Sequence, residues 1–469
     1  MPSSTTSSPD NLPIVVVGAG PVGLAAAAHL AERGLDFLVL EAGSGPAAAM
    51  ASWGHVRVFS PWRFNLDHAA RRLLEADGWI APDLAELPLG AQIVTDYLEP
   101  LTKLPAFAGR VRYGARVVAI SRDGLDRVRT TGREDTPFLI RLATGEELTA
   151  RAVIDASGTW PTPNVLGGSG LPAHGEPEAA AYVDSALPDV LGGDRDRFAG
   201  RHTLVVGAGH SAANTLLALA QLATEAPGTT VSWAIRTGAA ARTYGGGDAD
   251  ALPARGALGT RVRALVESGA ITLHTGFSVR AVSVDGGTVT VTSRGGASVT
   301  ADRIVSATGF RPDHTIASEL RLDLDPVLGS TRALAPLIDP NQHSCGTVPP
   351  HGVDELAQPE TGYYAVGAKS YGRAPTFLMA TGYEQVRSVV AALAGDWDAA
   401  RDVRLELPET GVCSSSAALG ADDDAACCGT AEPAAAAPRG LATGVAGGLL
   451  TLPVVQAAPG ETETGGCCG

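Results

Sequence analysis

A glycine-rich turn between two short apolar runs constrains this chain more than any other feature. Residues 14–17 (IVVV) predict a buried strand that leads directly into the turn at residues 18–23 (GAGPVG). An Ala-rich helix is expected to about Arg33, and a second strand at residues 37–40 ends at Glu41. Strand, glycine turn, helix and strand in this order predict a βαβ unit of a parallel sheet.

Each residue type in this unit has a physical reason to be there. Gly18 permits the tight turn, Gly20 lets the backbone approach a pyrophosphate, and Gly23 lets the helix pack closely on the strand. Glu41, at the end of the second strand, can accept hydrogen bonds from ribose hydroxyls. The unit therefore predicts a dinucleotide-binding site, and the alternative is an ordinary glycine turn.

The same pattern recurs in the middle of the chain. Residues 203–206 predict a strand, residues 207–212 (GAGHSA) form a turn of the same spacing with Ala in the third place, and residues 213–223 predict a helix. The expected contacts of a second dinucleotide are Gly207, Gly209 and Ser211.

The second unit ends in a cation where the first ends in an acid. The strand predicted at residues 230–235 is followed by Arg236, with Arg242 a little further on. A cation at this place suits the 2′-phosphate of NADPH. The alternative is that either arginine is a solvated surface charge.

Two dinucleotide sites in one chain predict a flavin and a nicotinamide, since hydride passes between these cofactors. Residues 153–158 (VIDASG) and 304–309 (IVSATG) are apolar strands that run into small turns ending at Gly158 and Gly309. They bracket the second site and indicate crossing points between two domains. The predicted fold is α/β, with two Rossmann-like domains, the NADPH domain inserted into the FAD domain.

On these motifs the chain resembles the flavoproteins with two dinucleotide-binding domains, the superfamily of thioredoxin reductase and the flavin-containing monooxygenases. The resemblance implies FAD in the first site and NADPH in the second. It implies an FAD domain at 13–165 and 313–406, with the NADPH domain inserted at 166–312. Composition predicts a disordered leader at 1–12 and a disordered, cysteine-bearing tail at 407–469.

The closing part of the FAD domain departs from this family. Residues 362–367 (GYYAVG) look like its last strand, and residues 383–393 look like the helix whose N-terminus faces the flavin pyrimidine. The family usually has Gly-Asp after that strand, with the Asp holding the ribityl chain. Here Gly367 is followed by Ala368 and Lys369, so another residue is expected to make that contact.

Charge and composition exclude several other classes of protein. The formal charge of −15 and the pI near 5.1 repel nucleic acid and anionic membrane surfaces, so the expected partner is a small molecule. The first residues lack the pattern of a signal peptide, and no apolar run reaches membrane-spanning length. We therefore expect a cytoplasmic protein, in which six cysteines are poor candidates for a disulfide framework.

The positions of the cysteines limit the reaction. No cysteine precedes Cys345, so the thiol pair of the dithiol reductases is absent from the body of the chain, and reaction of the flavin with oxygen is favoured. Residues 53–67 concentrate aromatic and polar side chains, among them Trp62 and Arg63. Flavin-containing monooxygenases have an asparagine beside the oxygen site in a matching region, and Asn65 looks like that residue. The alternative is core packing for the aromatics and a turn role for Asn65.

The remaining thiols suggest binding of a soft ion. Cys345 lies two residues after His343 in a Pro/Gly-rich loop, and the tail carries vicinal pairs. Such thiols can hold trivalent arsenic, antimony or mercury, and a mobile arm could deliver the ion. An inert buried Cys345, adventitious tail thiols and a redox relay remain open. The predicted metal ligands are Cys345, Cys427, Cys428, Cys467 and Cys468.

Taken as a whole, the chain resembles the flavin-dependent monooxygenases of bacterial arsenic-resistance operons. That resemblance implies an FAD enzyme that uses NADPH and oxygen and acts through a flavin hydroperoxide on a soft nucleophile, with arsenite as a candidate substrate. Asn65, Arg63 and Cys345 would act at the reaction centre, and a homodimer is a candidate assembly. Two alternatives stay open: a reductase that passes electrons through the tail cysteines, and a thiol-rich scavenger or sensor without catalysis.

Overall fold

The computed structural model describes residues 11–244, 253–343 and 348–405, without the side chains of 241–242 and 253–255. The chain divides into Met1–Leu419 and Gly420–Gly469, and the second unit lies outside the described residues. Cys345 and the predicted tail with its cysteines also lie outside them, as does most of the predicted leader.

A parallel five-stranded sheet has the order β16-β7-β1-β2-β3. Strand β1 stands at its centre, because it pairs with β2 on one side and with β7 on the other. The chain therefore leaves β1 towards β2 and returns on the opposite side, which makes the carboxyl end of β1 a switch point. The strands are β1 (Ile14–Val17), β2 (Phe37–Leu40), β3 (Val111–Arg112), β7 (Ala152–Asp155) and β16 (Tyr363–Ala365).

A second parallel five-stranded sheet is built from the middle of the chain. Its order is β11-β10-β9-β15-β8, so β9 again has its sequence neighbour on one side and a distant strand on the other. The strands are β8 (Val183–Ser185), β9 (His202–Val206), β10 (Thr230–Ala234), β11 (Thr272–His274) and β15 (Arg303–Ser306).

Two antiparallel three-stranded sheets complete the β structure of the described residues. Each is a meander between strands of a parallel sheet, and alternate residues of β13 are buried, as expected for a sheet with one covered face. The strands are β4 (Val117–Arg122), β5 (Phe138–Leu142), β6 (Glu147–Ala150), β12 (Val279–Asp285), β13 (Thr288–Ser293) and β14 (Ser298–Ala301).

The longer helices follow the strands of the two parallel sheets. They are α1 (Pro21–Glu32), α3 (His68–Ala76), α7 (His210–Glu225), α9 (Pro253–Glu267) and α12 (Met379–Leu393). Short helices lie in the connections: α2 (Ala48–Ala51), α4 (Gly90–Gln92), α5 (Glu99–Lys103), α6 (Arg195–Phe198), α8 (Ala241–Tyr244), α10 (Ala335–Ile338), α11 (Val353–Leu356) and α13 (Trp397–Arg401). Single 3₁₀ turns include η2 (Trp62–Phe64) and η8 (Gly367–Lys369), and η3 (Ile93–Leu98) is a π-helical stretch.

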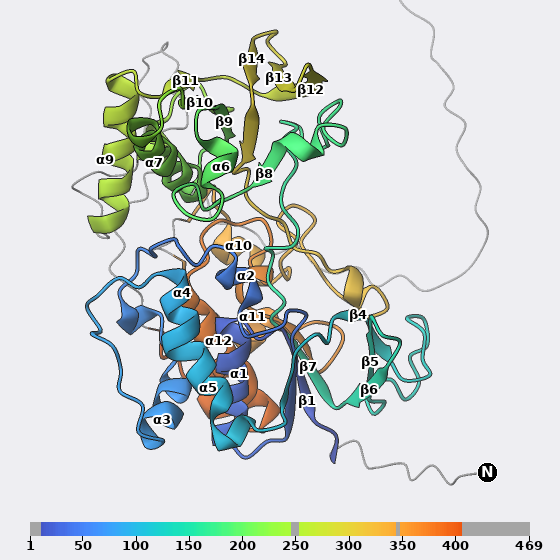
Figure 1. The fold of residues 1–469 in the computed structure, drawn as a ribbon. Coiled ribbons are helices and arrows are strands. Elements are labelled where there is room, and N and C mark those ends of the chain that lie inside the picture. The colour runs from blue at the N-terminus through green and yellow to red at the C-terminus, as the bar shows by residue number, and fades with distance from the viewer. Residues whose placement is uncertain (1–10, 245–252, 344–347, 406–469) are drawn as a thin grey trace, which may run out of the picture. The chain divides into compact units, whose positions relative to one another are not determined.

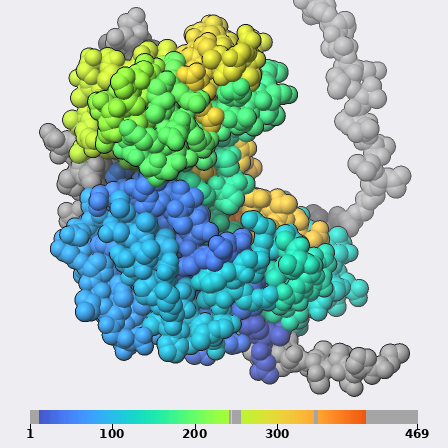
Figure 2. All heavy atoms as spheres, viewed as in Figure 1, coloured from blue at the N-terminus to red at the C-terminus, as the bar shows by residue number. Residues whose placement is uncertain are grey.

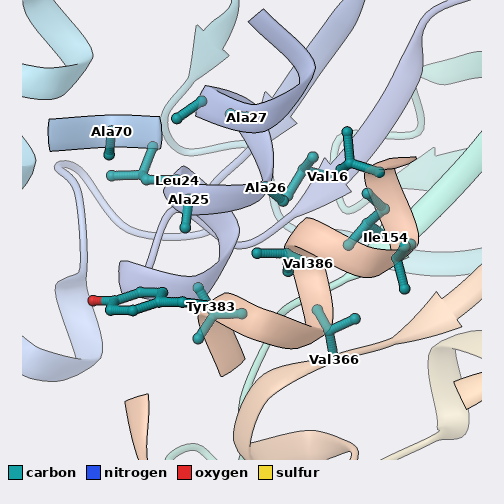
Figure 3. Close-up of a cluster of buried hydrophobic side chains, with 14 of the residues drawn as sticks. Val16, Leu24, Ala25, Ala26, Ala27, Ala70, Ile154, Val366, Tyr383 and Val386 are labelled. Carbon is teal, nitrogen blue, oxygen red and sulfur yellow. The ribbon is translucent and has the colours of Figure 1, made fainter. Parts of the chain in front are cut away.

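Helices α1 and α12, far apart in sequence, lie side by side (Figure 1). Small side chains such as Ala25 and Ala26 are fully buried on α1 and let α12 approach with Val386 (Figure 3). On the face drawn in Figure 2 much of the surface of the lower part is formed by the blue N-terminal residues. Helix α12 contributes Val386 and Val389 to the buried cluster around α1.

Two helices begin earlier than the sequence analysis predicted. Helix α12 starts at Met379 and not at Tyr383, and α7 starts at His210 and not at residue 213. In α12 the reason is packing: a Cβ atom on Gly382 would lie 2.6 Å from Val22 Cγ2, so this glycine lets the first turn approach α1. Tertiary contact thus outweighs the low helix propensity of glycine.

Candidate functional site

The three glycines of the first turn have the geometry that the motif predicts. Gly18 has φ +98°, and a Cβ atom there would lie 2.8 Å from the carbonyl oxygen of Ala156. A Cβ atom on Gly23 would lie 2.0 Å from the oxygen of Gly18, whereas one on Gly20 would have nothing within 4 Å. The open side of Gly20, beside the uncapped start of α1, fits a diphosphate.

Glu41 follows β2 and is held by backbone donors on both carboxylate oxygens. The amide of Ala19 donates to Oε2 and that of Gly43 donates to Oε1, each over 2.7 Å. Each oxygen keeps a further lone pair, and the residue is 9% exposed. The carboxylate is therefore fixed at the place where a ribose would present its hydroxyls.

The second glycine turn repeats this geometry at the end of β9. Gly207 has φ +134°, and a Cβ atom there would lie 2.0 Å from the oxygen of Ala307, while Gly209 again has nothing within 4 Å. The third position is Ala212, fully buried, and Ser211 lies in the first turn of α7. This turn also fits a diphosphate, with Ser211 as an additional donor.

Of the two predicted cations near β10, the structure describes the side chain of Arg236. Arg236 follows the strand closely and is exposed, with a single long contact of 3.5 Å from Nη1 to the oxygen of Gly168. Its guanidinium is therefore available to a ligand phosphate. The side chain of Arg242 lies outside the described part of the chain.

The two crossing segments are tied together through Asn164. Its backbone amide donates to the oxygen of Gly309 over 2.8 Å, and its side-chain amide donates to the oxygen of Thr308 over 3.0 Å. The Nε atom of Arg311 donates to Asn164 Oδ1 over 3.0 Å. Gly158 and Gly309 have φ +72° and +85°, so glycine is needed at both turns.

The loop predicted to face the flavin is held by Asn65. Its side-chain nitrogen donates to the carbonyl oxygens of Ser60 (2.6 Å) and Pro61 (3.0 Å), and its own carbonyl accepts from the hydroxyl of Tyr383 in α12 (2.8 Å). Asn65 is buried, and none of these bonds uses its side-chain oxygen Oδ1.

The neighbours of Asn65 have different surroundings. Trp62 is 2% exposed and belongs to the core around α1, which is the packing role considered above as the alternative. Arg63 is exposed, with its guanidinium carbon 4.8 Å from the ring centroid of Phe64. Phe59 lies 5.1 Å, between ring centroids, from His210 at the start of α7, so this loop reaches the second glycine turn.

The element expected to close the flavin site has the properties of an anion-binding helix end. Gly367 has φ +68°, and η8 leads towards α12, whose N-cap residue Leu378 provides no side-chain cap. Just before it, Thr376 is 5% exposed, and its hydroxyl has no hydrogen-bond partner within the described residues. A free helix start and an orphaned buried hydroxyl fit the polar edge of a flavin ring.

A buried ion pair that the sequence did not predict lies at the end of β7. Lys369 Nζ donates to Asp155 Oδ2 over 2.6 Å, and both side chains are almost fully buried. Burial by itself would raise the pKa of Asp155, but the ammonium of Lys369 and the hydrogen bonds from Ser157 hold it below its usual value. A charged residue at the end of the apolar run VID was the signal that could have revealed it.

An aromatic cluster was also missed, because its members come from three segments. Trp160 lies 6.3 Å from Trp53 and 4.7 Å from Phe310 between ring centroids. Trp160 and Phe310 directly follow the two crossing turns, so the fold brings them together and the sequence keeps them apart.

The predicted metal ligands cannot be placed in this site. Cys345, Cys427, Cys428, Cys467 and Cys468 lie outside the described residues. Within residues 11–244, 253–343 and 348–405 there is no group of three or more His, Cys, Asp or Glu side chains that could hold a metal ion. In the same ranges no helix is long and apolar enough to span a bilayer.

Comparison with known proteins places this architecture in a family. Residues 15–344 match the model of the pyridine nucleotide-disulphide oxidoreductases, and the chain belongs to that family. It is therefore an oxidoreductase, and the prediction of FAD and NADPH as its cofactors is confirmed at the level of the family.

Individual relatives include both monooxygenases and reductases. The chain is 32% identical over 201 residues to the indole-3-pyruvate monooxygenase YUCCA1 of Oryza sativa subsp. japonica, which covers 42% of each protein. The match thus spans about two fifths of that relative's length.

Solved structures confirm the α/β fold with its Rossmann-like sheets. The bacillithiol disulfide reductase of Bacillus cereus superposes with a TM-score of 0.60 at 19% identity, over 82% of this chain and 99% of the other. A variant flavin monooxygenase of Stenotrophomonas maltophilia gives a TM-score of 0.53 at 21% identity, over 81% and 99%. At these identities the likeness concerns the fold, which serves both reactions.

Proposed function

We propose that this protein is an NADPH-dependent flavin monooxygenase that transfers one oxygen atom to a soft nucleophile. The observation that carries the proposal is the absence of any cysteine before Cys345 in the sequence. The elements that line the two glycine turns therefore contain no thiol pair that could take electrons from a flavin. Oxygen is then the acceptor that needs no further group on the protein.

The proposed division of labour follows the two turns. The turn of Gly207 and Gly209, with Ser211 and Arg236, would hold NADPH, and the turn of Gly18, Gly20 and Gly23, with Glu41, would hold FAD. When bound, FAD accepts a hydride from NADPH and passes two electrons to O₂, so that one oxygen atom goes to the substrate and the other leaves as water.

Residues near the proposed reaction centre have distinct tasks. Asn65 would use its free amide oxygen to accept a hydrogen bond from the activated oxygen species, while its amide nitrogen keeps the loop closed. Arg63, exposed on the same loop, would meet the substrate or the nicotinamide. The proposed FAD domain comprises residues 13–165 and 313–406, and the proposed NADPH domain comprises residues 166–312. Each domain would then contain one of the two glycine turns.

For the substrate we propose a trivalent arsenical, with the cysteines of the tail and Cys345 as its thiolate ligands. The support is chemical, because soft ions bind vicinal thiolates. A sulfur or nitrogen nucleophile is the second substrate class, and the half-buried rings of Trp53, Trp160 and Phe310 would suit its apolar part.

We propose that the protein acts in the cytoplasm, where its thiols stay reduced, and that it assembles as a homodimer.

The test is the stoichiometry of turnover. NADPH oxidation, O₂ uptake and hydrogen peroxide are measured together, with arsenite, a thioether and an amine as separate substrates. The proposal expects one NADPH and one O₂ per oxygenated product with little peroxide. Turnover that yields peroxide alone with every substrate contradicts it, and anaerobic NADPH oxidation driven by a disulfide or a metal ion would favour the reductase.

A further inference from the structure

Four side chains form a polar network under the carboxyl end of β7. Asp155 is the last residue of that strand, Ser157 follows in the crossing turn, Tyr363 opens β16, and Lys369 closes η8. Asp155, Tyr363 and Lys369 are at most 1% exposed, whereas Ser157 is exposed. A buried network therefore supports the hydroxyl of one exposed residue.

The hydrogen bonds of this network leave Ser157 with one vacant position. Asp155 Oδ1 accepts from the Ser157 amide (3.1 Å) and hydroxyl (2.6 Å), and Lys369 Nζ donates to the Ser157 hydroxyl oxygen (3.1 Å). The hydroxyl hydrogen is thus committed to the carboxylate, and one lone pair is committed to the ammonium. The second lone pair remains, so Ser157 Oγ can meet a ligand only as an acceptor.

The other oxygen of the carboxylate is saturated in the same way. Asp155 Oδ2 accepts from the hydroxyl of Tyr363 over 2.9 Å and from Lys369 over 2.6 Å. The carboxylate remains ionised because its pKa is lowered by Lys369 and Ser157 against the effect of burial. The direction of the Ser157 hydroxyl is therefore fixed by a charge that cannot leave the site.

The vacant position lies beside the glycine turn that fits the diphosphate of FAD. Asp155 is in register with Val17 of β1 and with Ala365 of β16, at the carboxyl edge of the sheet. A Cβ atom on Gly18 would lie 3.3 Å from the Cα atom of Ser157, so the backbone of Ser157 is next to the diphosphate turn. The flavin ring is expected at the start of α12, and the chain between them carries the ribityl hydroxyls.

The ribityl hydroxyls can donate hydrogen bonds and therefore need an acceptor on the protein. The residue after Gly367 is Ala368, whose side chain offers no polar atom, so the closing strand cannot accept from them through that position. We propose that Ser157 Oγ accepts a hydrogen bond from a ribityl hydroxyl of FAD, and that Asp155 and Lys369 are positioning residues that hold Ser157 in its accepting orientation. The proposal rests on FAD as the cofactor and not on the reaction with oxygen.

The choice of lysine at residue 369 supports its proposed role in positioning Ser157. The whole sequence contains 35 basic residues but only two lysines, Lys103 and Lys369. A compact ammonium can donate to two neighbouring oxygens in a narrow buried space, where the wide planar guanidinium of arginine would not fit.

The first experiment measures the dissociation constant of FAD from the apoprotein by quenching of flavin fluorescence, with no substrate present. Ser157→Ala should weaken binding about five- to tenfold, the range expected for one hydrogen bond, in an apoprotein that remains folded at the temperature of the titration. Ser157→Thr keeps the hydroxyl and should stay within about twofold of the wild type. Equal binding by Ser157→Ala and the wild type overturns the proposal, and so does an equal loss in the Ala and Thr variants.

A second set of variants tests the positioning residues. Lys369→Met should weaken FAD binding about as much as Ser157→Ala, and the double variant should bind no worse than either single one. Tyr363→Phe is the matched control, because it removes a donor from the same carboxylate and leaves Ser157 oriented. A loss in Tyr363→Phe as large as that in Lys369→Met overturns the positioning role.

A spectroscopic readout remains if Lys369→Met does not fold. Because the chain has only two lysines, protein labelled with ¹⁵N at the lysine side chains gives two ammonium signals. Addition of FAD to the apoprotein should shift the signal of Lys369 and leave that of Lys103, whose side chain is 74% exposed, as the internal reference. A Lys369 signal that does not respond to FAD overturns the proposal. Failure of oxygen transfer in the wild type would leave all these results unchanged.

Discussion

At the scale of the residue, the glycines of the first turn differ in what a methyl group would meet. A Cβ atom on Gly20 points into open space, whereas one on Gly23 would lie 2.0 Å from the backbone oxygen of Gly18. Gly20→Ala should therefore fold normally but bind FAD at least about tenfold more weakly, because the methyl group occupies the path of the diphosphate. Gly23→Ala should lower the free energy of unfolding by roughly 1–3 kcal/mol. Urea denaturation and flavin titration separate the two effects, and equal stability of both variants contradicts this view.

Arg236 is the residue whose change should alter the choice of nicotinamide. Its guanidinium is exposed and weakly engaged, so a 2′-phosphate can reach it. Arg236→Ala should raise the KM for NADPH by about tenfold or more and leave the KM for NADH unchanged, because only NADPH carries the phosphate. Arg280→Ala, an exposed arginine on β12, is the control and should change neither value. An equal rise for both nucleotides in Arg236→Ala would argue against phosphate recognition.

At the scale of the element, a buried carboxylate joins three separate segments. Glu360 accepts from Arg122 at the end of β4 (2.7 Å), from Arg133 in the β4–β5 connection (2.7 Å) and from the backbone of Arg321 (3.0 Å). Burial opposes its charge, but the two guanidinium groups lower the pKa of Glu360 on balance. The pair of arginines depends on this one anion.

Loss of that anion should be costly. Glu360→Ala leaves two buried guanidinium groups without a counter-ion, and we expect the free energy of unfolding to fall by about 3–5 kcal/mol. Glu147→Ala removes an exposed partner of Arg141 and should have no measurable effect on the urea midpoint. A small change in Glu360→Ala would mean that water replaces the carboxylate.

His351 contacts Gln385, which joins α12 to the turn η8, and should make stability depend on pH. Its ring nitrogens contact the oxygen of Pro349 and the side-chain nitrogen of Gln385, both at 3.0 Å, and Gln385 Oε1 accepts from the amide of Gly367. Burial lowers the pKa of His351 below its ordinary value of 6.5, although Glu355 and Glu384 act in the opposite direction. The neutral ring is thus the form that the folded state prefers.

The sign of the pH effect follows from that preference. The contribution of neutral His351 is complete above pH 6.5 and is lost as the pH falls towards its lower folded pKa. The free energy of unfolding should therefore decrease on acidification below pH 6.5, by at most about 1.4 kcal/mol per pH unit for this group. His351→Asn should flatten the slope, with a remainder from His314, whose pKa is also lowered by burial. A slope equal to that of the wild type contradicts the assignment.

At the scale of the whole molecule, the described flavoprotein body and the cysteine-bearing tail should act separately. Removal of residues 407–469 should leave the rate of flavin reduction by NADPH unchanged, because both glycine turns precede that point. Arsenite binding, measured by calorimetry on the reduced protein, should weaken by about tenfold or more, since vicinal thiolates bind soft ions jointly. Replacement of the four vicinal tail cysteines by serine is the matched control. Unchanged affinity in both proteins would exclude the tail from substrate binding.

The sequence alone determined the features that depend on local chemistry. A glycine turn between apolar strands predicts its own φ angles and close contacts, and the backbone geometry of Gly18, Gly20, Gly207 and Gly209 agrees with what their spacing predicts. The same holds for the α/β class, because strand, turn and helix alternate within short stretches of chain. The position of the cysteines in the sequence is likewise the basis of the proposed reaction with oxygen.

The tertiary structure decided what depends on residues far apart in the chain. Asp155 and Lys369 are 214 residues apart in the sequence and form an ion pair only because β16, which leads into η8, lies parallel to β7. The contacts by which the side-chain nitrogen of Asn65 holds its loop, to the oxygens of Ser60 and Pro61, also became known only from the tertiary structure. A buried charge is tolerated only where its partner is found, and the sequence does not say which distant segment supplies that partner.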